Sequence, residues 1–335
     1  MERNRLKELL IQFKKQNILV IGDLMLDRYI WGRVERISPE APVPIVLVNK
    51  EEIVCGGACN VAANIARLGA RASMVGFLGN DFYGRQLDAE LKKISICTDG
   101  IIVEPGRQTT VKSRIIGNNQ QIARIDREEI EPRGLEMEHK LMSRIESIIK
   151  KNNITGIVIS DYAKGAISGP VLDYVIRLAR KSSIFVSVDP KLKNFHLYKD
   201  VGIITPNHAE TSQTLGIYLD SEDKFLEAGR TLLKRHKSEA ILITRGANGM
   251  QLFEKSGRIQ HIPTKARKVF DVTGAGDSVI ATFALTKACN STFVEAAEVS
   301  NFAAGYVVGI LGTATCNPEN LLEFFDECTK STALS

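Results

Sequence analysis

The chain has 335 residues, 44% of them hydrophobic and 25% charged, which suits a soluble globular protein with a large core. Lys and Arg number 44 and Asp and Glu 39, and the resulting charge of +5 is spread along the chain. Because the positive charge is not gathered in a basic block, the sequence does not support nucleic-acid binding, but it allows small anionic ligands. The six cysteines form no CxxC pair, and no apolar run reaches membrane-spanning length. With no secretion signal at the N-terminus, we expect a cytoplasmic protein with no membrane partner.

Strand-like and helix-like segments alternate from the N-terminus onward. Apolar residues at helical spacing predict a helix over 3–15, and "NILVIGD" (17–23) follows as a buried strand that ends in a carboxylate. The later segments are predicted helices at 60–68, 84–94, 169–181, 208–215 and 222–235, and strands at 72–79, 100–103, 155–160, 184–189, 201–205 and 239–244. Buried strands that alternate with helices predict a mostly parallel sheet covered on both faces.

A small β excursion interrupts this alternation. "RYIWGRV" and "VPIVLVNK" flank the proline-bearing "ISPEAP", and "TTVKSRII" and "QQIARIDRE" flank the turn "GNN" with period-two alternation. No repeat or long linker divides the chain. The sequence therefore predicts one α/β domain over 1–335, with a β lid from about 28–48 and 108–126.

The stretch "DVTGAGD" (271–277) places a glycine-rich turn directly before an apolar, helix-like run. Free backbone N–H groups and the helix dipole at such a position favour anions. Asp277 beside an anion site would be out of place unless its carboxylate takes part in chemistry. The alternative is that Asp277 only caps the helix and that the glycines only form the turn.

A second glycine pair, in "CGGACN", precedes another apolar helix. Gly56 and Gly57 permit close backbone approach, and Asn60 can hydrogen-bond to hydroxyl groups. Considered alone, this segment is better explained by a capping turn before a helix.

Together, the two glycine motifs resemble the two signatures of the ribokinase/PfkB family of carbohydrate kinases. "GNDFYG" (79–84), "TPNHAE" (205–210), "ITRGANG" (243–249) and "NFAAGYVVGILGTAT" (301–315) extend the resemblance over essentially the whole chain. The resemblance implies a ribokinase-like three-layer α/β/α fold and an ATP-dependent phosphotransferase that uses Mg²⁺.

Within the family, "GDLMLDRYIWGRVERISPEAPVPIV", "SDYAKG" (160–165) and "VDPK" (188–191) are similar to kinases acting on D-glycero-β-D-manno-heptose 7-phosphate. The resemblance implies phosphorylation of the C1 hydroxyl to the 1,7-bisphosphate, on the route to ADP-heptose for lipopolysaccharide or another surface glycan. It also implies the stand-alone kinase form, without a nucleotidyltransferase domain. Cys59 departs from the pattern, since small residues such as Ala are more usual there. Two alternatives stay open, namely a kinase of another sugar, sugar phosphate or nucleoside, and a silent sugar-binding protein on this fold.

The resemblance also assigns roles to residues of the sugar and phosphate sites. Asp277 is the expected general base, and the expected anion hole comprises the amides of Gly274, Ala275 and Gly276. The residues expected to hold sugar hydroxyls are Asp23, Asp27, Gly56, Gly57 and Asn60. The candidates for binding the 7-phosphate are Lys164, Lys191, Arg114 and Arg124, although a lone surface cation is more often only solvated.

The nucleotide and its ions have their own candidate residues. Asn207 and Glu210 match the element that organises Mg²⁺, mostly through water, and the pair could also cap a helix, since the two roles are compatible. The other nucleotide contacts implied are Thr244, Gly246, Gly249, Gly274, Gly276 and Asn301. Asp271 and Thr273 match a K⁺ site of some relatives, or they merely brace the turn. The lid implies a homodimer, because an open sheet with apolar faces needs covering.

Overall fold

The computed structural model describes residues 1–265, 269–310 and 312–332; residue 311 of the 301–315 motif and six further residues of the predicted 1–335 domain lie outside this part. The described helices are α1 (Arg3–Phe13), α2 (Ala58–Arg67), α3 (Phe82–Lys93), α4 (Leu135–Lys151), α5 (Gly169–Lys181), α6 (His208–Leu215), α7 (Glu222–His236), α8 (Ala275–Ala288), α9 (Phe293–Val307) and α10 (Pro318–Thr332), with short 3₁₀ turns at Leu192–Leu197 and Gly246–Asn248. The described strands are β1 (Asn17–Gly22), β2 (Leu24–Ile37), β3 (Pro44–Gly57), β4 (Arg71–Gly79), β5 (Cys97–Glu104), β6 (Thr110–Gly117), β7 (Gln120–Arg127), β8 (Gly156–Ser160), β9 (Phe185–Asp189), β10 (Ile203–Ile204), β11 (Ala240–Thr244), β12 (Met250–Glu254) and β13 (Ile259–Ile262).

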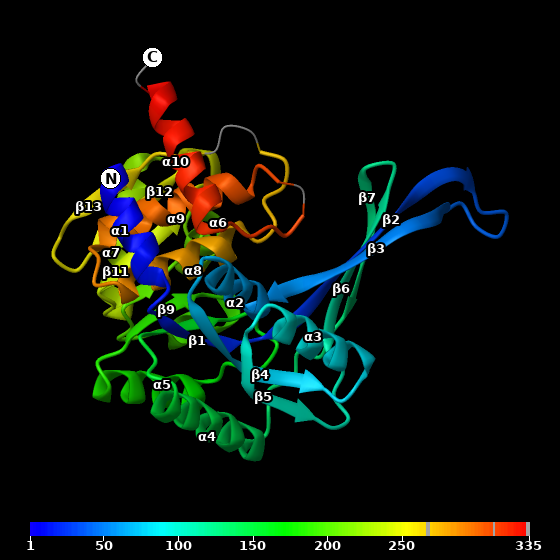
Figure 1. Cartoon of the computed structure of the whole chain (residues 1–335), viewed down its shortest axis with the longest axis horizontal. Coiled ribbons are helices and arrows are strands. Elements are labelled where there is room, and N and C mark those ends of the chain that lie inside the picture. The colour runs from blue at the N-terminus through cyan, green and yellow to red at the C-terminus, as the bar shows by residue number, and fades with distance from the viewer. Residues whose placement is uncertain (266–268, 311, 333–335) are drawn as a thin grey trace.

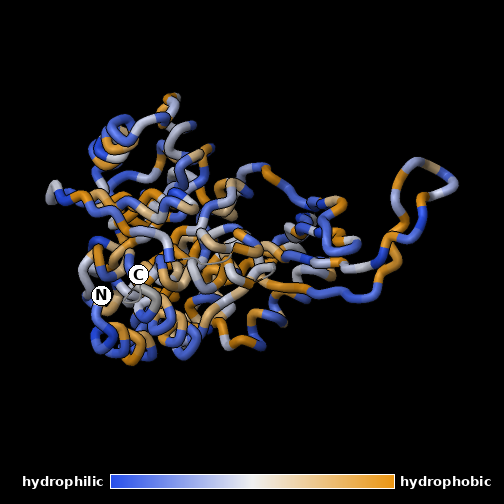
Figure 2. Tube along the Cα trace, turned by 90° about the horizontal axis from the view of Figure 1, so that it is seen from above, coloured by the Kyte–Doolittle hydropathy of each residue, from blue (hydrophilic) through white to orange (hydrophobic). Residues whose placement is uncertain are grey.

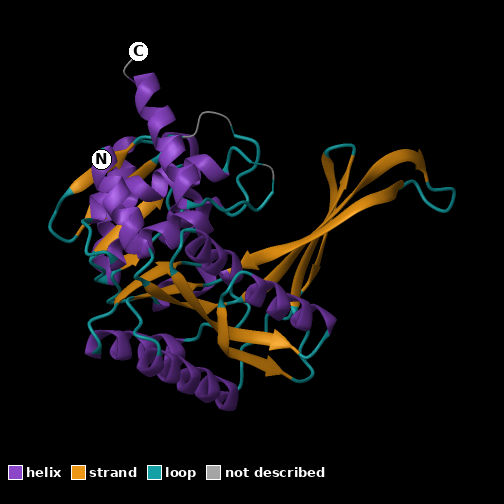
Figure 3. Cartoon of the chain, viewed as in Figure 1, coloured by secondary structure: helices purple, strands orange, loops and turns teal. Residues whose placement is uncertain are grey.

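A nine-stranded sheet with the order β13-β12-β11-β10-β9-β8-β1-β4-β5 forms the middle layer of the body. Its strands from β11 to β5 are parallel, and β12 and β13 are added antiparallel at one edge. Helices cover both faces (Figures 1 and 3), with α1, α2, α8, α9 and α10 on one side and α4, α5 and α7 on the other. The predicted three-layer, mostly parallel architecture is confirmed.

The chain leaves β1 toward β4 on one side and later returns to β8 on the other. In open α/β sheets, ligands bind at the carboxyl ends of the strands at such a switch point. Asp23 directly follows β1 at this position. The topology therefore places the end of "NILVIGD" beside the ends of β8 and β9.

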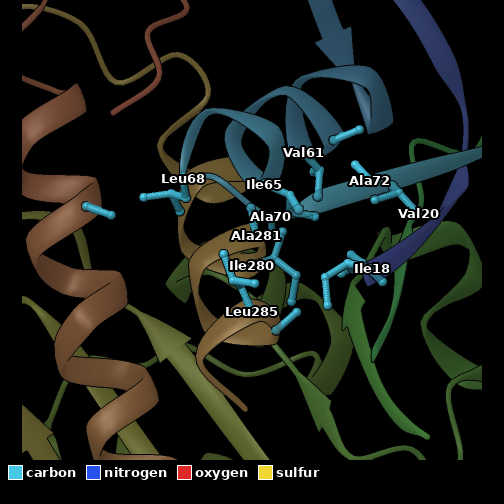
Figure 4. Packing of buried hydrophobic residues seen from close by; sticks show 14 of the residues in the cluster. Ile18, Val20, Val61, Ile65, Leu68, Ala70, Ala72, Ile280, Ala281 and Leu285 are labelled. Carbon is cyan, nitrogen blue, oxygen red and sulfur yellow. The ribbon is translucent and has the colours of Figure 1, made fainter. Parts of the chain in front are cut away.

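Helix α8 is buried on all sides, unlike a surface helix with one apolar stripe. Ile280 and Leu285 of α8 pack between α2, represented by Ile65, and β1, represented by Ile18 and Val20 (Figure 4). Burying each such side chain stabilises the fold by about 2 kcal/mol. This packing fixes α8 rigidly against the sheet, and with it the glycine-rich turn at its first residue.

A four-stranded sheet with the order β3-β2-β6-β7 projects from the body as an arm (Figures 1 and 2). Its strands extend beyond the bounds expected for the lid, since β2 starts at Leu24 and β3 continues to Gly57. The first residues of β2 and the last residues of β3 are buried on both faces. They therefore lack the alternation of apolar and polar residues by which a half-exposed strand is recognised in the sequence.

Candidate active site

Most residues predicted for catalysis and nucleotide binding line one cavity of about 180 Å³ at the carboxyl ends of β8 to β11. The N-terminus of α8 closes one side of the cavity. Its lining residues are Asp161, Tyr162, Asp189, Pro190, Lys191, Thr205, Asn207, Glu210, Thr244, Gly274, Gly276, Asp277 and Val279. The fold thus brings together the "SDYAKG", "VDPK", "TPNHAE" and "DVTGAGD" motifs, which are far apart in the sequence.

Asp277 lies in the first turn of α8 and is buried. Its Oδ2 accepts a hydrogen bond of 2.7 Å from Asn60 Nδ2, and its Oδ1 accepts one of 2.6 Å from the Tyr162 hydroxyl. Neither bond is an N-cap bond, because Asp277 lies inside the helix and Gly274 is the cap residue. The carboxylate is therefore oriented by α2 and by the loop after β8, and not by its own helix.

Burial raises the pKa of Asp277 to about 6, while the hydrogen bonds from Tyr162 and Asn60 act in the opposite direction. Burial also raises the pKa values of Asp161, Asp189 and Glu210, which line the same cavity. For Asp189 the neighbouring carboxylates add to this effect. A pKa near 6 allows Asp277 to be ionised at neutral pH and still accept a proton.

The two glycines of the glycine-rich turn differ in whether the fold requires a residue without a side chain. Gly274 has φ +77°, and a Cβ there would lie 2.8 Å from Asn60 Nδ2, so this position requires glycine. A Cβ on Gly276 would meet nothing within 4 Å, so its glycine is not needed for packing within the described chain. The Ala275 N–H donates to the carbonyl of Val272 at 3.2 Å and is thus already bonded inside the turn.

Asp271 braces the far end of this turn. Its carboxylate accepts hydrogen bonds from the N–H groups of Thr273 at 2.9 Å and Gly312 at 3.1 Å. Partial burial opposes ionisation, but these bonds and the nearby Arg114 lower the pKa of Asp271 overall. The carboxylate is thus anionic and ties the α8 turn to the segment after α9.

Asp23 is 3% exposed, and its carboxylate is directed at protein backbone. It accepts hydrogen bonds from the N–H groups of Tyr162 (2.8 Å), Lys164 (3.0 Å) and Ala166 (2.9 Å). Three such bonds make the 162–166 loop a partner of Asp23, and a contact of its carboxylate with a sugar hydroxyl stays a prediction.

Gly56 and Gly57 end β3 and lie against β2. A Cβ on Gly56 would lie 2.6 Å from Asp27 Oδ2, and Gly57, with φ +53°, would contact Met25 at 2.6 Å. The pair therefore serves close strand packing at the root of the lid. A direct sugar contact by their backbone stays a prediction.

Each lid or loop cation proposed for the 7-phosphate has a carboxylate partner. Arg114 Nη1 lies 2.6 Å from Asp27 Oδ1 in a mostly buried ion pair. Lys164 pairs with Glu128 at 2.7 Å, and the more exposed Arg124 pairs with Asp126 at 2.9 Å. Lys191 instead lines the cavity of Asp277, while Lys164 lines a separate small cavity with Asp23, Arg107 and Arg133. The structure thus places Lys191 and Lys164, both candidates for the 7-phosphate, in different cavities.

Asn207 and Glu210 form a capping box at the start of α6. Asn207 Oδ1 accepts from the Glu210 N–H, and Glu210 Oε2 accepts from the Asn207 N–H, both at 2.9 Å. The capping alternative is therefore correct, and it leaves Glu210 Oε1 outside the box.

The remaining nucleotide candidates are spread around the same edge. Thr244 lines the cavity, and its neighbour Gly246 lies in open space. Gly249 has φ +75° and packs on the backbone after β13. Asn301 is buried and donates to the Pro263 carbonyl at 2.7 Å, so its amide positions a loop.

Tyr162 and the buried carboxylates Asp161 and Asp189 were not predicted as site residues. All three lie inside quoted motifs, "SDYAKG" and "VDPK", so the signal was present without a role attached. Arg107 and Arg133, whose guanidinium groups are buried beside Glu104, had no motif to mark them. Only the fold brings these two arginines together near Asp23.

Comparison of the sequence with known proteins identifies related kinases. Residues 15–320 match the pfkB family carbohydrate kinase. The chain is 42% identical over 322 residues to the "Bifunctional protein HldE" of Geobacter metallireducens and 40% identical over 324 residues to that of Paramagnetospirillum magneticum. Each match covers 96% of this chain but 65% of the relative, so the chain spans just under two thirds of these relatives' length.

Solved structures share the fold at low sequence identity. Phosphofructokinase-2 from Escherichia coli superimposes with a TM-score of 0.77 and 18% identity, over 94% of this chain and 99% of that one. Ribokinase from Arabidopsis thaliana gives a TM-score of 0.71 and 18% identity, over 92% and 98%. The chain thus shares the fold of these two sugar kinases. The chain belongs to the pfkB family of carbohydrate kinases, as the motifs predicted.

The absence of a transmembrane run noted in the sequence extends to the structure. None of the helices in the described ranges has both the length and the apolar character needed to cross a bilayer.

Proposed function

We propose that the protein transfers the γ-phosphoryl group of ATP to the C1 hydroxyl of D-glycero-β-D-manno-heptose 7-phosphate, giving the 1,7-bisphosphate that leads to ADP-heptose. The observation that supports it most is the buried Asp277, held in the first turn of α8 between Asn60 and Tyr162. The heptose assignment is supported by the "ISPEAP" and "SDYAKG" segments and by 40–42% identity to the HldE proteins.

In this mechanism Asp277 takes the proton of the C1 hydroxyl while the oxygen attacks the γ-phosphorus. A new P–O bond forms, the bond to the β-phosphate oxygen breaks, and ADP leaves. Negative charge that builds on the transferred group lies at the N-terminus of α8, where the amides of Gly274 and Gly276 and the helix dipole favour it. The predicted contribution of Ala275 is dropped, because its N–H already donates to the carbonyl of Val272. We assign Lys191 to the same phosphoryl group, since it lines this cavity.

The residues present suit a hard cation at the nucleotide phosphates. Glu210 and Asn207 supply oxygen ligands, and burial raises the pKa of Glu210, which a bound cation would reverse. We propose that Asn207 and Glu210 would hold Mg²⁺, mostly through water, and that a bound Mg²⁺ would supply positive charge at the ATP phosphates. A K⁺ site at Asp271 and Thr273 is a weaker proposal, supported by the anionic state of Asp271.

The sugar is proposed to lie between α2 and the root of the lid. On that side Asn60 hydrogen-bonds to Asp277, and Asp27, which is paired with Arg114, acts on the Asp277 carboxylate by its charge. For the 7-phosphate, Lys164 and Arg114 are the stronger candidates, since both are partly buried, while Arg124 is half exposed. Binding would require the phosphate to share these cations with Glu128 and Asp27.

The test is ATP- and Mg²⁺-dependent turnover with a panel of heptose 7-phosphate, sedoheptulose 7-phosphate, fructose 6-phosphate, ribose and adenosine. Preference for heptose 7-phosphate with a 1,7-bisphosphate product supports the proposal. Preference for another compound would leave the kinase chemistry and discard the substrate. Tight sugar binding without turnover would indicate a silent binder.

Asp277→Asn tests the base itself. We expect turnover to fall by about 10²–10⁴-fold while ATP binding is kept, because the amide cannot accept the proton. An Asn variant with near-normal turnover would contradict the assignment.

A further inference from the structure

The carboxylate of Asp277 is held by two side chains from distant parts of the chain. Asn60 is 217 residues away in sequence and Tyr162 is 115 residues away, and each donates to a different oxygen. An ionised carboxylate offers about four acceptor positions, so two donors leave room for a substrate hydroxyl. The two bonds therefore fix the rotation of the carboxylate without exhausting its capacity to accept.

Tyr162 is in turn fixed by the loop in which it lies. The buried Asp23 carboxylate accepts from the N–H groups of Tyr162, Lys164 and Ala166, which are spread over five consecutive residues. Within this span Ala163 adopts φ +56°, a conformation that is costly for a residue with a Cβ. Such a backbone persists only where surrounding bonds hold it, and Asp23 supplies three of them.

A second carboxylate secures the start of the same loop. Asp161 accepts from the Ala163 N–H at 2.6 Å, from Asn194 Nδ2 at 2.7 Å and from the Tyr198 hydroxyl at 2.5 Å. Tyr162 is therefore held from both sides. The hydrogen bonds around the loop therefore fix the position of the Tyr162 hydroxyl.

We propose that Tyr162 is a positioning residue for the base, and that Asp23 acts through the 162–166 loop to place the Tyr162 hydroxyl on Asp277. This inference rests on the proposed role of Asp277. It gives Asp23 a task at the end of β1 that needs no contact with the sugar, in agreement with its three backbone partners.

A hydroxyl that donates to the ionised form of Asp277 also favours that form. The other ionisable groups that act on this carboxylate are Asp27 on β2, Asp189 at the end of β9 and the thiol of Cys59 on α2. None of them donates a hydrogen bond to it among the described contacts, whereas Tyr162 and Asn60 do. Loss of the Tyr162 hydroxyl should therefore make Asp277 harder to ionise.

The experiment compares Tyr162→Phe with Tyr174→Phe. Tyr174 is a matched control, because its hydroxyl also donates to a carboxylate, Glu146, but on the outer face between α4 and α5. In protein carrying ¹³C-carboxyl aspartate, the Asp277 signal is assigned from Asp277→Asn and titrated without substrate. We expect Tyr162→Phe to raise its titration midpoint by about one pH unit, and Tyr174→Phe to leave it unchanged.

Kinetics supply the second readout. Tyr162→Phe should lower kcat by about tenfold with a smaller effect on KM, and should move the acidic limb of kcat/KM upward with the NMR midpoint. An unmoved midpoint in Tyr162→Phe would overturn the inference. If Asp277→Asn keeps its turnover, the proposed base is wrong, yet the titration still decides whether Tyr162 acts on Asp277.

Asp23→Asn tests the role of the loop. Its amide NH₂ cannot accept from a backbone N–H, so we expect the Asp277 midpoint to rise in the same direction. In a double-mutant cycle, Tyr162→Phe should then add little, because Asp23 acts through Tyr162. Full additivity of the two shifts would overturn the role of Asp23, and if Asp23→Asn does not fold, Tyr162→Phe still decides the role of Tyr162.

Discussion

At the scale of single residues, the site depends on keeping one carboxylate buried but ionised. Desolvation raises the pKa of Asp277 to about 6, against an ordinary value of 3.8. Hydrogen bonds from Asn60 and Tyr162 limit the rise, so most molecules still carry the base form at neutral pH. The same burial that strengthens the base makes the ionised state costly for the fold.

The pH dependence of activity follows from this pKa. Asp277 is the active base when ionised, so kcat/KM should be constant well above pH 6 and fall about tenfold per unit below it. The acidic limb of the kcat/KM profile is measured from initial rates between pH 4.5 and 8.5, with the coupling enzymes in excess. A limb near pH 4 would mean that Asp277 is as solvated as an ordinary carboxylate.

Stability should change in the opposite sense. Because the folded pKa is above the unfolded one, the native state binds more protons between pH 3.8 and about 6, and the contribution of Asp277 penalises folding above that range. Asp277→Asn removes a penalty of at most about 3 kcal/mol, so we expect its Tm at pH 7.5 to rise by about 2–4 °C although activity is lost.

Asp126→Asn on the lid is the matched control for this stability effect. Although partial burial opposes it, ion pairs with Lys112 and Arg124 lower the pKa of Asp126, so its neutralisation should lower Tm slightly or leave it unchanged. Equal shifts in both variants would show that charge removal in general, and not burial of Asp277, is responsible.

At the scale of elements, the first turn of α8 carries two glycines, of which the fold requires only one. Gly274 needs its positive φ and lies against Asn60, whereas Gly276 is helical and its missing side chain would point into open space. The fold thus requires glycine at Gly274 but not at Gly276, and single substitutions separate the two positions.

We expect Gly276→Ala to keep or raise stability by about 0.5–1 kcal/mol, because alanine favours the helix. Its methyl group would occupy space in the cavity, so kcat/KM for ATP should fall at least about tenfold. Gly274→Ala should instead lower stability by about 1–2 kcal/mol through strain. Thermal unfolding and ATP kinetics on both variants check the pair; equal stability losses would contradict this division.

At the scale of the whole molecule, the lid is an open four-stranded sheet that extends away from the body (Figure 2). Large apolar side chains are exposed along it, including Leu47 at 64% and Ile125 at 57%. An open sheet with uncovered apolar residues gains stability when a second copy covers it. This supports the proposed homodimer through the lid.

Leu47→Glu should therefore shift the protein toward a monomer, because it places a charge where an apolar contact is expected. Ile11→Glu on α1 is the control, since Ile11 is 66% exposed but lies on the body. Sedimentation equilibrium over a concentration series measures the association. A wild-type monomer, or equal effects of both changes, would argue against the lid as the interface.

The sequence by itself determined the layer architecture, the lid and the motifs, because hydrophobic period and glycine placement are local properties of the chain. It predicted Asp277 and the helix that carries it, and it left the helices α4, α9 and α10 and the antiparallel strands β12 and β13 undescribed. The strands β12 and β13 are only five and four residues long, so their local signal is weak.

Only the tertiary structure decided which side chains meet. Local sequence does not show that Tyr162 and Asn60 converge on Asp277, that Asp23 binds a backbone loop, or that Lys191 and Lys164 line different cavities. These contacts join residues more than a hundred positions apart, and they depend on the order of strands in the sheet. The chemistry of each group is local, but its partner is set by topology.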